Sequence, residues 1–397
     1  MKSIRYLFRF LLLIIIILVT FQFIINTKFS FPEPRVFNGV KLYNPYLGID
    51  STKWKRANFH LHTRLLFGLT AGASITNQIA DNFYKFFNYD IHSTSDYMRI
   101  NTFNCNNKSF VPVYEHGYSY YKTHQLVLNA KKVFWGDYLF HQTLNNKQFI
   151  INELKKDTAA LVTLVHPLRR NAFSTSDFKY LGNYDCLEII NNEENFTKYL
   201  DAALSAGHAV FIMADDDAHN LSDINSGAHS FNIINADLEK NSIIHALRTG
   251  RAYGVSLNMN ACRTSEEKKE AIEELPVLTK FEIKHDTLIV KMNKNVSAIK
   301  FIGQNGTPKK KSVNCSSGIY LFSNEDTYIR TEIVCNDGAV CFLNPVFRYD
   351  GYKLPVNNPG INILKTWTYR ILFSVILFII IFVDVKYKAC IKGKKLL

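Results

Sequence analysis

The chain has 397 residues, of which 47% are hydrophobic and 20% are charged, and its formal net charge is +13 at pH 7. This length suffices for two soluble domains and additional segments. The positive charge does not indicate a nucleic-acid-binding protein, because no repeat of basic and aromatic residues is present and much of the excess lies near the chain ends. The basic residues near the ends are Lys2, Arg5, Arg9, Lys386, Lys388, Lys392, Lys394 and Lys395.

Two segments near the ends of the chain have the composition of membrane spans. Residues 10–25 are almost wholly apolar, and residues 366–385 reach the length of about 20 residues that a bilayer requires. A cleaved signal peptide is the alternative for the first segment, but no small-x-small cleavage site follows Ile25. We therefore expect an N-terminal transmembrane anchor at residues 1–27 and a C-terminal transmembrane helix at residues 366–385.

The basic residues also predict the orientation of these segments. They precede the first segment and follow the second, so the positive-inside rule places both termini in the cytoplasm, including a basic tail at residues 386–397. The central domains then lie on the outer side of the cytoplasmic membrane. In an oxidising compartment Cys315, Cys335 and Cys341 are candidates for one disulfide, whose pairing stays open.

The central part of the chain begins with an alternation of apolar runs and helical patterns. Residues 28–55 contain three prolines and predict an extended linker. Residues 56–262 then alternate in the way that is typical of parallel βα units. The apolar runs are residues 58–63, 89–97, 161–167, 187–191 and 210–219, and the helical patterns are residues 74–87, 148–156, 193–206 and 237–249. Each apolar run carries His, Asp or Glu at or near its end, which predicts an α/β barrel with its active site at the carboxyl ends of the strands.

The composition of the sequence changes after residue 262. Residues 263–276 are rich in charge and predict a solvated helix or linker. Residues 277–350 contain short β-prone runs separated by Asn-Gly, Ser-Gly and Asp-Gly pairs. Such spacing is typical of hairpins, and it predicts a small antiparallel β-sandwich.

The first apolar run contains a pair of histidines. His60 and His62 are separated by one residue, so on a strand both imidazoles lie on one face while Phe59 and Leu61 face away. Two converging imidazoles can hold one divalent ion. The alternative is a pair of polar residues on a solvated strand face.

Several motifs together resemble the PHP (polymerase and histidinol phosphatase) superfamily, and in particular a membrane-associated subgroup. The residues that carry the resemblance are His60-x-His62-Thr63, Asp96, Glu115, His166-Pro167 and Asp217-Ala218-His219, followed by residues 246–253 and the β-rich tail. The resemblance covers residues 58–350 and implies a distorted seven-stranded barrel that holds two or three ions of Zn, Mn or Fe. It implies a first metal on His60, His62, Glu115 and Asp217, a second on Glu115, His124 and His166, and a place for His219 at a third.

The sequence departs from the family pattern at the third metal. Tyr97 stands where the pattern has a histidine, and residues 64–68 supply neither a carboxylate nor an imidazole. We therefore expect two divalent ions and an incomplete third site, with compensation by Asp96 or His92 left open. Glu188, Asp215 and Asp216 match no ligand of the pattern and are expected to play structural or supporting roles.

These observations predict a membrane-anchored metal-dependent phosphoesterase of the PHP type. A hydroxide held by two metals would attack phosphorus, Asp217 and His219 would transfer protons, and Arg169 and Arg170 would bind phosphate oxygens. One alternative is a degenerate PHP domain that binds a ligand or partner without catalysis. Another is a related metallohydrolase acting on C–N or carboxylic ester bonds. The expected partners are a phosphoester of unknown identity and the lipid bilayer, but no nucleic acid.

Overall fold

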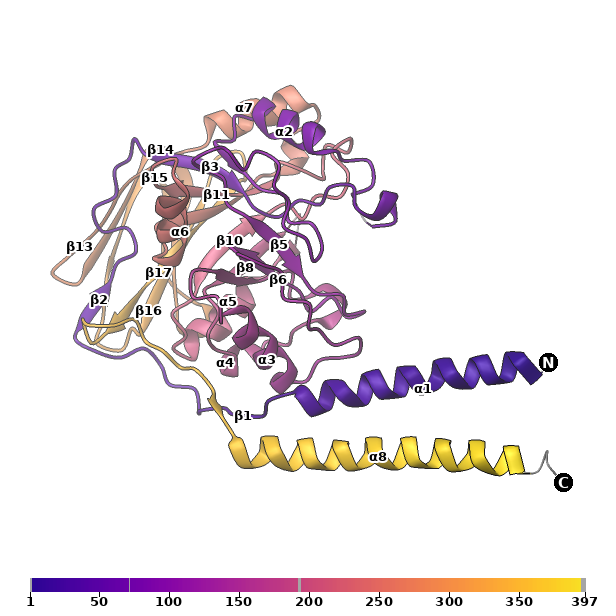
Figure 1. Ribbon diagram of the computed structural model, residues 1–397. Helices are drawn as coiled ribbons and strands as arrows, with labels where there is room; N and C mark the ends of the chain where they lie inside the picture. Colours follow the sequence, from indigo (N-terminus) through magenta and orange to yellow (C-terminus); the bar gives the residue numbers. More distant parts are fainter. Residues whose placement is uncertain (1, 71, 192–193, 394–397) are drawn as a thin grey trace.

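The computed structural model describes residues 2–70, 72–191 and 194–393, and it places two long helices side by side (Figure 1). Helix α1 (Lys2–Ile25) and helix α8 (Ile363–Gly393) run antiparallel and project together away from the rest of the chain (Figure 1). The rings of Phe23 and Phe373 stack at 4.7 Å between them, and Arg9 pairs with Asp384 at 2.8 Å.

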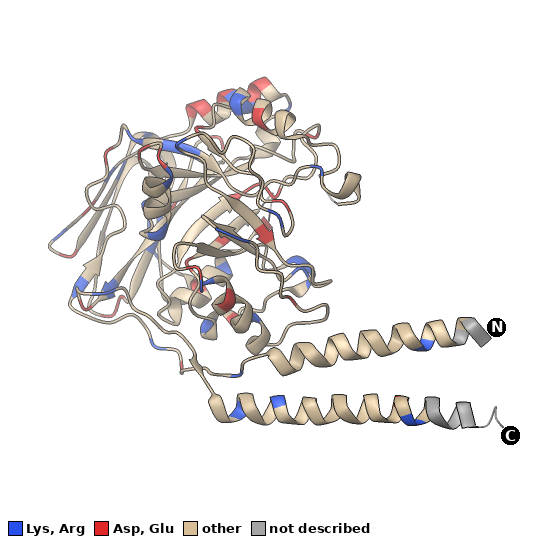
Figure 2. Cartoon of the chain, viewed as in Figure 1, with Lys and Arg blue, Asp and Glu red and all other residues tan. Residues whose placement is uncertain are grey.

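Both helices are long and apolar enough to cross a membrane, over Tyr6–Ile25 and Ile363–Tyr387. Charged residues are sparse along them, in contrast to the body of the protein (Figure 2). These segments agree with the two spans expected from the sequence. Residues 394–397 of the expected basic tail lie outside the described residues.

The segments that follow α1 and precede α8 are joined to each other. Strand β1 (Phe29–Ser30) pairs antiparallel with β18 (Gly360–Ile361), and the Lys28 N–H donates to the Thr366 hydroxyl at 2.9 Å. Farther on, β2 (Lys41–Tyr43) pairs with β17, and the Tyr46 side chain is fully buried. The segment expected as an extended linker therefore packs against the body over much of its length.

The first sheet contains six strands and carries several of the candidate site residues. Its order is β10-β8-β7-β6-β5, with β9 paired to β8. The strands are β5 (Val113–His116), β6 (Gln125–Leu128), β7 (Leu161–Leu164), β8 (Cys186–Asn191), β9 (Glu194–Asn195) and β10 (Phe211–Asp215). β7, β8 and β10 are parallel, as expected, but β6 is antiparallel to both of its neighbours because a short connection without a helix joins β5 directly to β6.

The second sheet contains ten strands in the order β13-β14-β16-β17-β12-β11-β3-β4, with β15 paired to β14 and β2 paired to β17. The strands are β3 (Trp54–Asn58), β4 (Ile91–His92), β11 (Ser230–Asn235), β12 (Ala252–Ser256), β13 (Leu278–Lys284), β14 (Thr287–Gly303), β15 (Thr307–Leu321), β16 (Tyr328–Val334) and β17 (Val340–Tyr349). The strands expected to form a separate β-sandwich thus continue the sheet of β3 and β11, because β12 pairs with β17.

The expected closed seven-stranded barrel is not found in the described part of the chain. The two sheets meet instead through isolated parallel bridges, at Leu61–Ala218 and at Tyr97–Glu115. Beside these bridges Asp217 and Met98 take positive φ angles of 48° and 51°. Such angles are incompatible with strand geometry, so regular pairing cannot continue past either bridge.

Helices connect and cover the strands close to where the sequence predicts them. They are α2 (Asn77–Phe86), α3 (Leu144–Leu154), α4 (Asp177–Tyr180), α5 (Thr197–Ser205), α6 (Lys240–Arg248) and α7 (Ser265–Glu274), with short 3-10 turns η1 (Leu66–Gly68), η2 (Arg169–Asn171), η3 (Met259–Ala261) and η4 (Gln304–Gly306). Thr143 and Thr264 begin α3 and α7 with reciprocal capping hydrogen bonds. α3 consequently starts one turn earlier than the apolar pattern alone predicts.

The three candidate disulfide cysteines are free thiols in the structure. Cys335 and Cys341 lie near the turn between β16 and β17. A hydrogen bond from the Cys341 thiol to Cys335, together with burial, raises the pKa of the Cys341 thiol.

A buried ion pair ties the C-terminal strands to helix α5. Arg330 on β16 donates two hydrogen bonds to the Asp201 carboxylate on α5, at 2.7 and 2.8 Å. The two side chains are only 5% and 11% exposed. Geometry of this kind satisfies both charges, and removal of one partner leaves the other desolvated.

We therefore expect Asp201→Ala to lower the free energy of unfolding by about 3 kcal/mol, because Arg330 keeps only Glu332 as a partner. Thermal unfolding of the full chain in detergent measures the effect. Lys280→Ala, which removes an exposed pair with Glu282, is the matched control and should cost about 0–1 kcal/mol. Equal shifts for the two variants would contradict the importance of the buried pair.

Candidate metal centre

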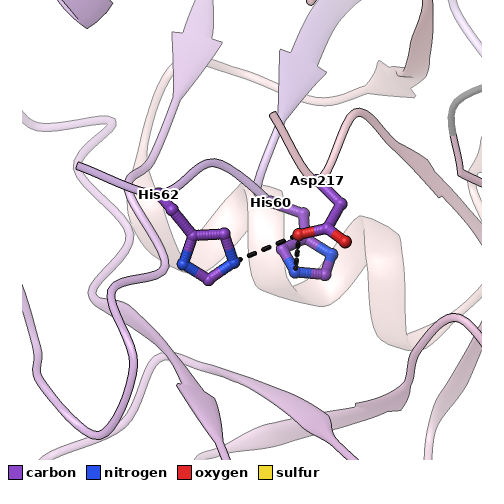
Figure 3. A group of neighbouring side chains, drawn as sticks. All are labelled: His60, His62 and Asp217. Atoms are coloured by element: carbon purple, nitrogen blue, oxygen red, sulfur yellow. Dashed lines mark ion pairs between the residues drawn. The ribbon is translucent and has the colours of Figure 1, made fainter. Parts of the chain in front are cut away.

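The paired histidines and Asp217 converge in the structure (Figure 3). His60 and His62 lie just beyond the end of β3, where the His62 N–H donates to the Ala218 carbonyl at 3.0 Å. The Nε2 atoms of both imidazoles lie 3.1 Å from Asp217 Oδ1. All three side chains are buried. Phe59 and Leu61 face away into two different apolar clusters, as the alternation along a strand requires.

Glu115 on β5 lies between this group and two further histidines. Its Oε1 atom is 2.5 Å from His124 Nδ1, 2.9 Å from His166 Nε2 and 3.7 Å from His60 Nε2. Its Oε2 atom is 3.1 Å from His62 Nε2. One carboxylate thus contacts four imidazoles that come from three separate parts of the chain.

The chemistry of these side chains fits divalent cations. In two groups of three, the potential ligand atoms all lie within 4.8 Å of one another: His60, His62 and Asp217, and His60, Glu115 and His166. Four atoms that face the cluster are buried and make no hydrogen bond to the described residues: His60 Nε2, His62 Nε2, Glu115 Oε2 and Asp217 Oδ1. The unpartnered nitrogens of His124 and His166, Nε2 and Nδ1, are not the ring atoms that contact Glu115. Buried polar atoms are normally satisfied, so inward-facing imidazole and carboxylate atoms without partners are the pattern expected of metal ligands.

The electrostatics of the cluster lead to the same conclusion. Burial opposes the ionisation of Glu115 and Asp217, but the neighbouring histidines hold the pKa of each carboxyl well below its usual range. Burial likewise disfavours the charged form of His60, yet the Asp217 and Glu188 carboxylates raise the pKa of its imidazole well above the ordinary value. Two buried carboxylates thus require positive charge, which divalent cations can supply.

Glu188 holds His60 and His166 in position. His60 Nδ1 lies 2.8 Å from Glu188 Oε1, and the His166 N–H donates to Glu188 Oε2 at 2.8 Å. A proton held on Nδ1 leaves His60 Nε2 free to bind a metal, so Glu188 fixes both the tautomer and the ring orientation. This agrees with the supporting role expected from the sequence.

Asp215 and Asp216 hold the backbone around the ligands. Asp215 accepts a hydrogen bond from the Phe59 N–H at 2.7 Å, immediately before His60. Asp216 accepts hydrogen bonds from Tyr84 and Asn58, each at 2.8 Å, and from three backbone N–H groups of residues 228–230. Both carboxylates therefore connect β10 to its neighbours, and neither enters the cluster of ligand atoms.

Two of the ligand candidates have unusual backbone geometry. His166 and Asp217 take φ angles of 30° and 48°, in the left-handed region. For residues other than glycine this costs about 1–3 kcal/mol, and such strain concentrates at functional sites. The strain at these two positions is offset by the contacts that hold their side chains in the cluster.

Tyr97, which stands in place of a family histidine, and Arg169 lie beside His62 and Asp217. The Tyr97 ring stacks on His62 at 4.2 Å, and His219 stacks on the same imidazole at 4.5 Å. The Tyr97 hydroxyl is 3.4 Å from His219 Nε2, while His219 Nδ1 is 2.6 Å from the Asp217 carbonyl. Arg169 donates a hydrogen bond to Asp217 Oδ2. An aromatic ring and a guanidinium thus surround the outer side of Asp217.

The other candidates lie outside the cluster. Asp96 accepts hydrogen bonds from the N–H and the hydroxyl of Thr63, at 2.9 and 2.7 Å, and His92 lies 3.3 Å from Asp81. Neither residue replaces the missing third ligand. Arg170 is directed away, with its guanidinium 4.5 Å above the Tyr120 ring. The stacking of Tyr97 was not foreseen, and its position in place of a family histidine was the one signal that could have suggested it.

The support of His60 by Glu188 predicts a loss of metal affinity without loss of fold. Glu188→Ala should weaken metal binding by about 10- to 100-fold, because the imidazole loses the partner that orients it. Competition with a chelator, followed by metal analysis of the purified protein, measures the change. Glu188→Gln keeps an acceptor for His60 Nδ1 and should recover part of the affinity. Unchanged affinity in Glu188→Ala would contradict this role.

Comparisons with known proteins give one solved structure of interest. The crystal structure of a two-domain protein from Bacteroides vulgatus, which contains a predicted PHP-like metal-dependent phosphoesterase, aligns with 84% of this chain and 99% of its own, at 9% identity and a TM-score of 0.41. No family model matches the chain, and no curated protein matches it.

Proposed function

We propose that the protein is a membrane-anchored, metal-dependent hydrolase of the PHP type that cleaves a phosphoester. The observation that carries the proposal is the burial of four imidazoles and two carboxylates around a common point, with ligand atoms that have no hydrogen-bond partner among the described residues. Such clusters serve metal-assisted hydrolysis, and paired metals favour the displacement of groups at phosphorus.

The residues divide between two metals. His60, His62 and Asp217 would hold the first, Glu115 and His166 the second together with His124, and the Glu115 carboxylate would be shared. The metals, when bound, supply Lewis acidity and lower the pKa of a coordinated water. The surrounding chain orients these ligands: Glu188 fixes the His60 ring, and the burial of the cluster excludes competing water.

Arg169 is the residue best placed to bind the substrate. Its guanidinium lies beside Asp217 but is 45% exposed, so it borders both the cluster and solvent. A guanidinium offers paired donors that match the oxygens of a phosphoryl group. Arg169 would provide positive charge beside Asp217, next to the third site that the sequence leaves incomplete.

His219 and Asp217 are proposed to move protons. Burial lowers the pKa of His219 to about 4, so its imidazole is neutral at pH 7. In this state its Nδ1 faces the Asp217 carbonyl, and Nε2 can accept a proton from the side of Tyr97. The role as a proton donor to the leaving oxygen stays a prediction.

The proposed location is the outer face of the cytoplasmic membrane. The support is the antiparallel pairing of α1 and α8, which puts both chain ends on one side of the helices and the body on the other (Figure 1). Basic residues near both ends then favour a cytoplasmic location for the termini.

Metal analysis of the full chain purified in detergent tests the function directly. We expect close to two divalent ions per chain and hydrolysis of an aryl phosphate monoester or diester after addition of Mn²⁺. His60→Ala and Asp217→Ala should each lower the metal content and abolish most of the activity. The Lys280→Ala variant, far from the ligands in sequence and structure, should retain both.

The outcomes also separate the alternatives. Bound metal without hydrolysis of any phosphoester would favour a domain that binds a ligand or partner. Hydrolysis of amides or carboxylic esters in place of phosphoesters would favour a related metallohydrolase. A protein that carries no metal and hydrolyses no phosphoester would end the enzyme proposal.

The proposed role of Arg169 predicts a change in substrate affinity. Arg169→Ala should raise KM by about 10- to 100-fold, since a hydrogen bond to a charged group contributes about 1.5–3 kcal/mol. Steady-state kinetics with an aryl phosphate measure KM and kcat separately. Arg170→Ala is the matched control, because this side chain contacts Tyr120 and not the cluster. If KM is unchanged in Arg169→Ala, the residue only neutralises Asp217.

A further inference from the structure

Two neighbouring loops on the body expose a cluster of large apolar side chains. The cluster, called here the apolar rim, consists of Tyr118, Tyr120, Trp135, Leu139 and Phe140. Trp135 is 67% exposed and Phe140 is 60% exposed. The two loops touch, since the Tyr120 N–H donates to the Leu139 carbonyl at 3.4 Å. Exposed aromatic clusters of this kind mark surfaces that are covered by something other than water.

The apolar rim lies beside the end of helix α1. Gln22, in the last turn of α1, donates a hydrogen bond to the Asp137 carbonyl at 3.0 Å, and Asp137 lies between Trp135 and Leu139. Gln22 is three residues before the end of the candidate span at Ile25, which corresponds to about 5 Å along a helix. The loop of Asp137 is therefore level with the end of the span, where a bilayer has its interface and where Trp and Tyr are enriched.

A short chain of hydrogen bonds connects the apolar rim to the metal ligands. The Asp137 carboxylate accepts hydrogen bonds from the N–H groups of Tyr118 and Ser119, at 2.7 and 3.0 Å. His116 Nε2 lies 2.9 Å from the Gly136 carbonyl, and His116 follows Glu115 directly. These hydrogen bonds fix the position of the candidate ligands relative to the apolar rim.

A second apolar loop follows His60 and His62. Leu66, Phe67 and Leu69 come shortly after His62, and Phe67 is 97% exposed. The short dark-purple turn of this segment lies at the edge of the body on the side toward which α1 and α8 project (Figure 1). A Cβ atom on Gly72 would lie 2.6 Å from the His62 carbonyl, so this loop also leaves and rejoins the body close to the ligands.

We propose that both apolar loops insert into the surface of the bilayer in which α1 and α8 are embedded, and that the substrate is a phosphoester headgroup of a lipid in that bilayer. The argument for a bilayer as the occupant is the contact between the rim and the end of α1. The assignment of a lipid headgroup as substrate rests on the proposed function. The insertion of the two loops into the bilayer does not. Arg170, whose guanidinium lies over the Tyr120 ring, borders the rim and would attract anionic headgroups.

Tryptophan emission tests the contact with the bilayer. The full chain contains only Trp54, Trp135 and Trp367, so a Trp367→Phe background leaves one reporter in the rim and one in the body. Trp54 donates its indole N–H to the Leu278 carbonyl and serves as the internal control. In vesicles of phosphatidylcholine and phosphatidylglycerol, bromine atoms on the upper acyl chains should quench Trp135. Addition of Trp135→Phe should remove the quenching. Equal emission with and without bromine would overturn the proposal.

Activity on two kinds of substrate tests the substrate class. The double variant Leu139→Asp/Phe140→Asp should hydrolyse phosphatidic acid or phosphatidylglycerol in vesicles about ten-fold more slowly, since interfacial binding depends on buried apolar area. Its hydrolysis of a soluble aryl phosphate should be unchanged. An equal loss on both substrates in the double variant would overturn the lipid assignment. It would also be overturned if the wild-type protein hydrolysed the aryl ester but neither lipid. Absence of all hydrolysis would refute the proposed function, and the quenching result would still decide the bilayer contact.

Discussion

The candidate metal centre depends on one buried carboxylate. Glu115 contacts His60, His62, His124 and His166 through its two oxygen atoms, and its side chain has almost no exposure to solvent. An anionic group in such surroundings is stable only when positive charge lies close by. The positions of the four imidazoles, and with them the meeting of the two sheets at the Tyr97–Glu115 bridge, follow from this requirement.

Around this carboxylate the protein separates the groups that bind from those that position. His60, His62 and Asp217 direct atoms without hydrogen-bond partners toward the cluster, whereas Asp215, Asp216 and Glu188 accept hydrogen bonds from backbone and side-chain groups around it. Asp215, Asp216 and Asp217 lie at or just after the end of β10, and His60 and His62 lie just beyond β3, whereas Glu188 lies within β8. Because three acidic residues stand consecutively at 215–217, a single turn at positive φ is enough to direct one carboxylate into the cluster and keep the others out.

Much of the site could be predicted because its signals are local. The one-residue spacing of His60 and His62, and the histidine before Pro167, single out candidate ligands without any knowledge of distant contacts. The partnership of His60 with Glu188 joins residues 128 positions apart, so no local pattern encodes it. The pairing of β12 with β17 also joins residues far apart in sequence, such as Tyr253 and Leu343, which is why the C-terminal strands looked like a separate sandwich. Tyr97 was recognised as a departure, but its stacking on His62 depends on three-dimensional packing.

The joined ends of the chain have a mechanical consequence. A domain carried by one membrane helix can swivel freely about the axis of that helix. Here the β1–β18 pairing and the Lys28–Thr366 hydrogen bonds unite two attachments that are more than three hundred residues apart in sequence. Two adjacent helices that are joined at the end nearest the body permit tilting of the body but resist its rotation about a helix axis. If α1 and α8 span a bilayer, as proposed, the body would keep one face toward it.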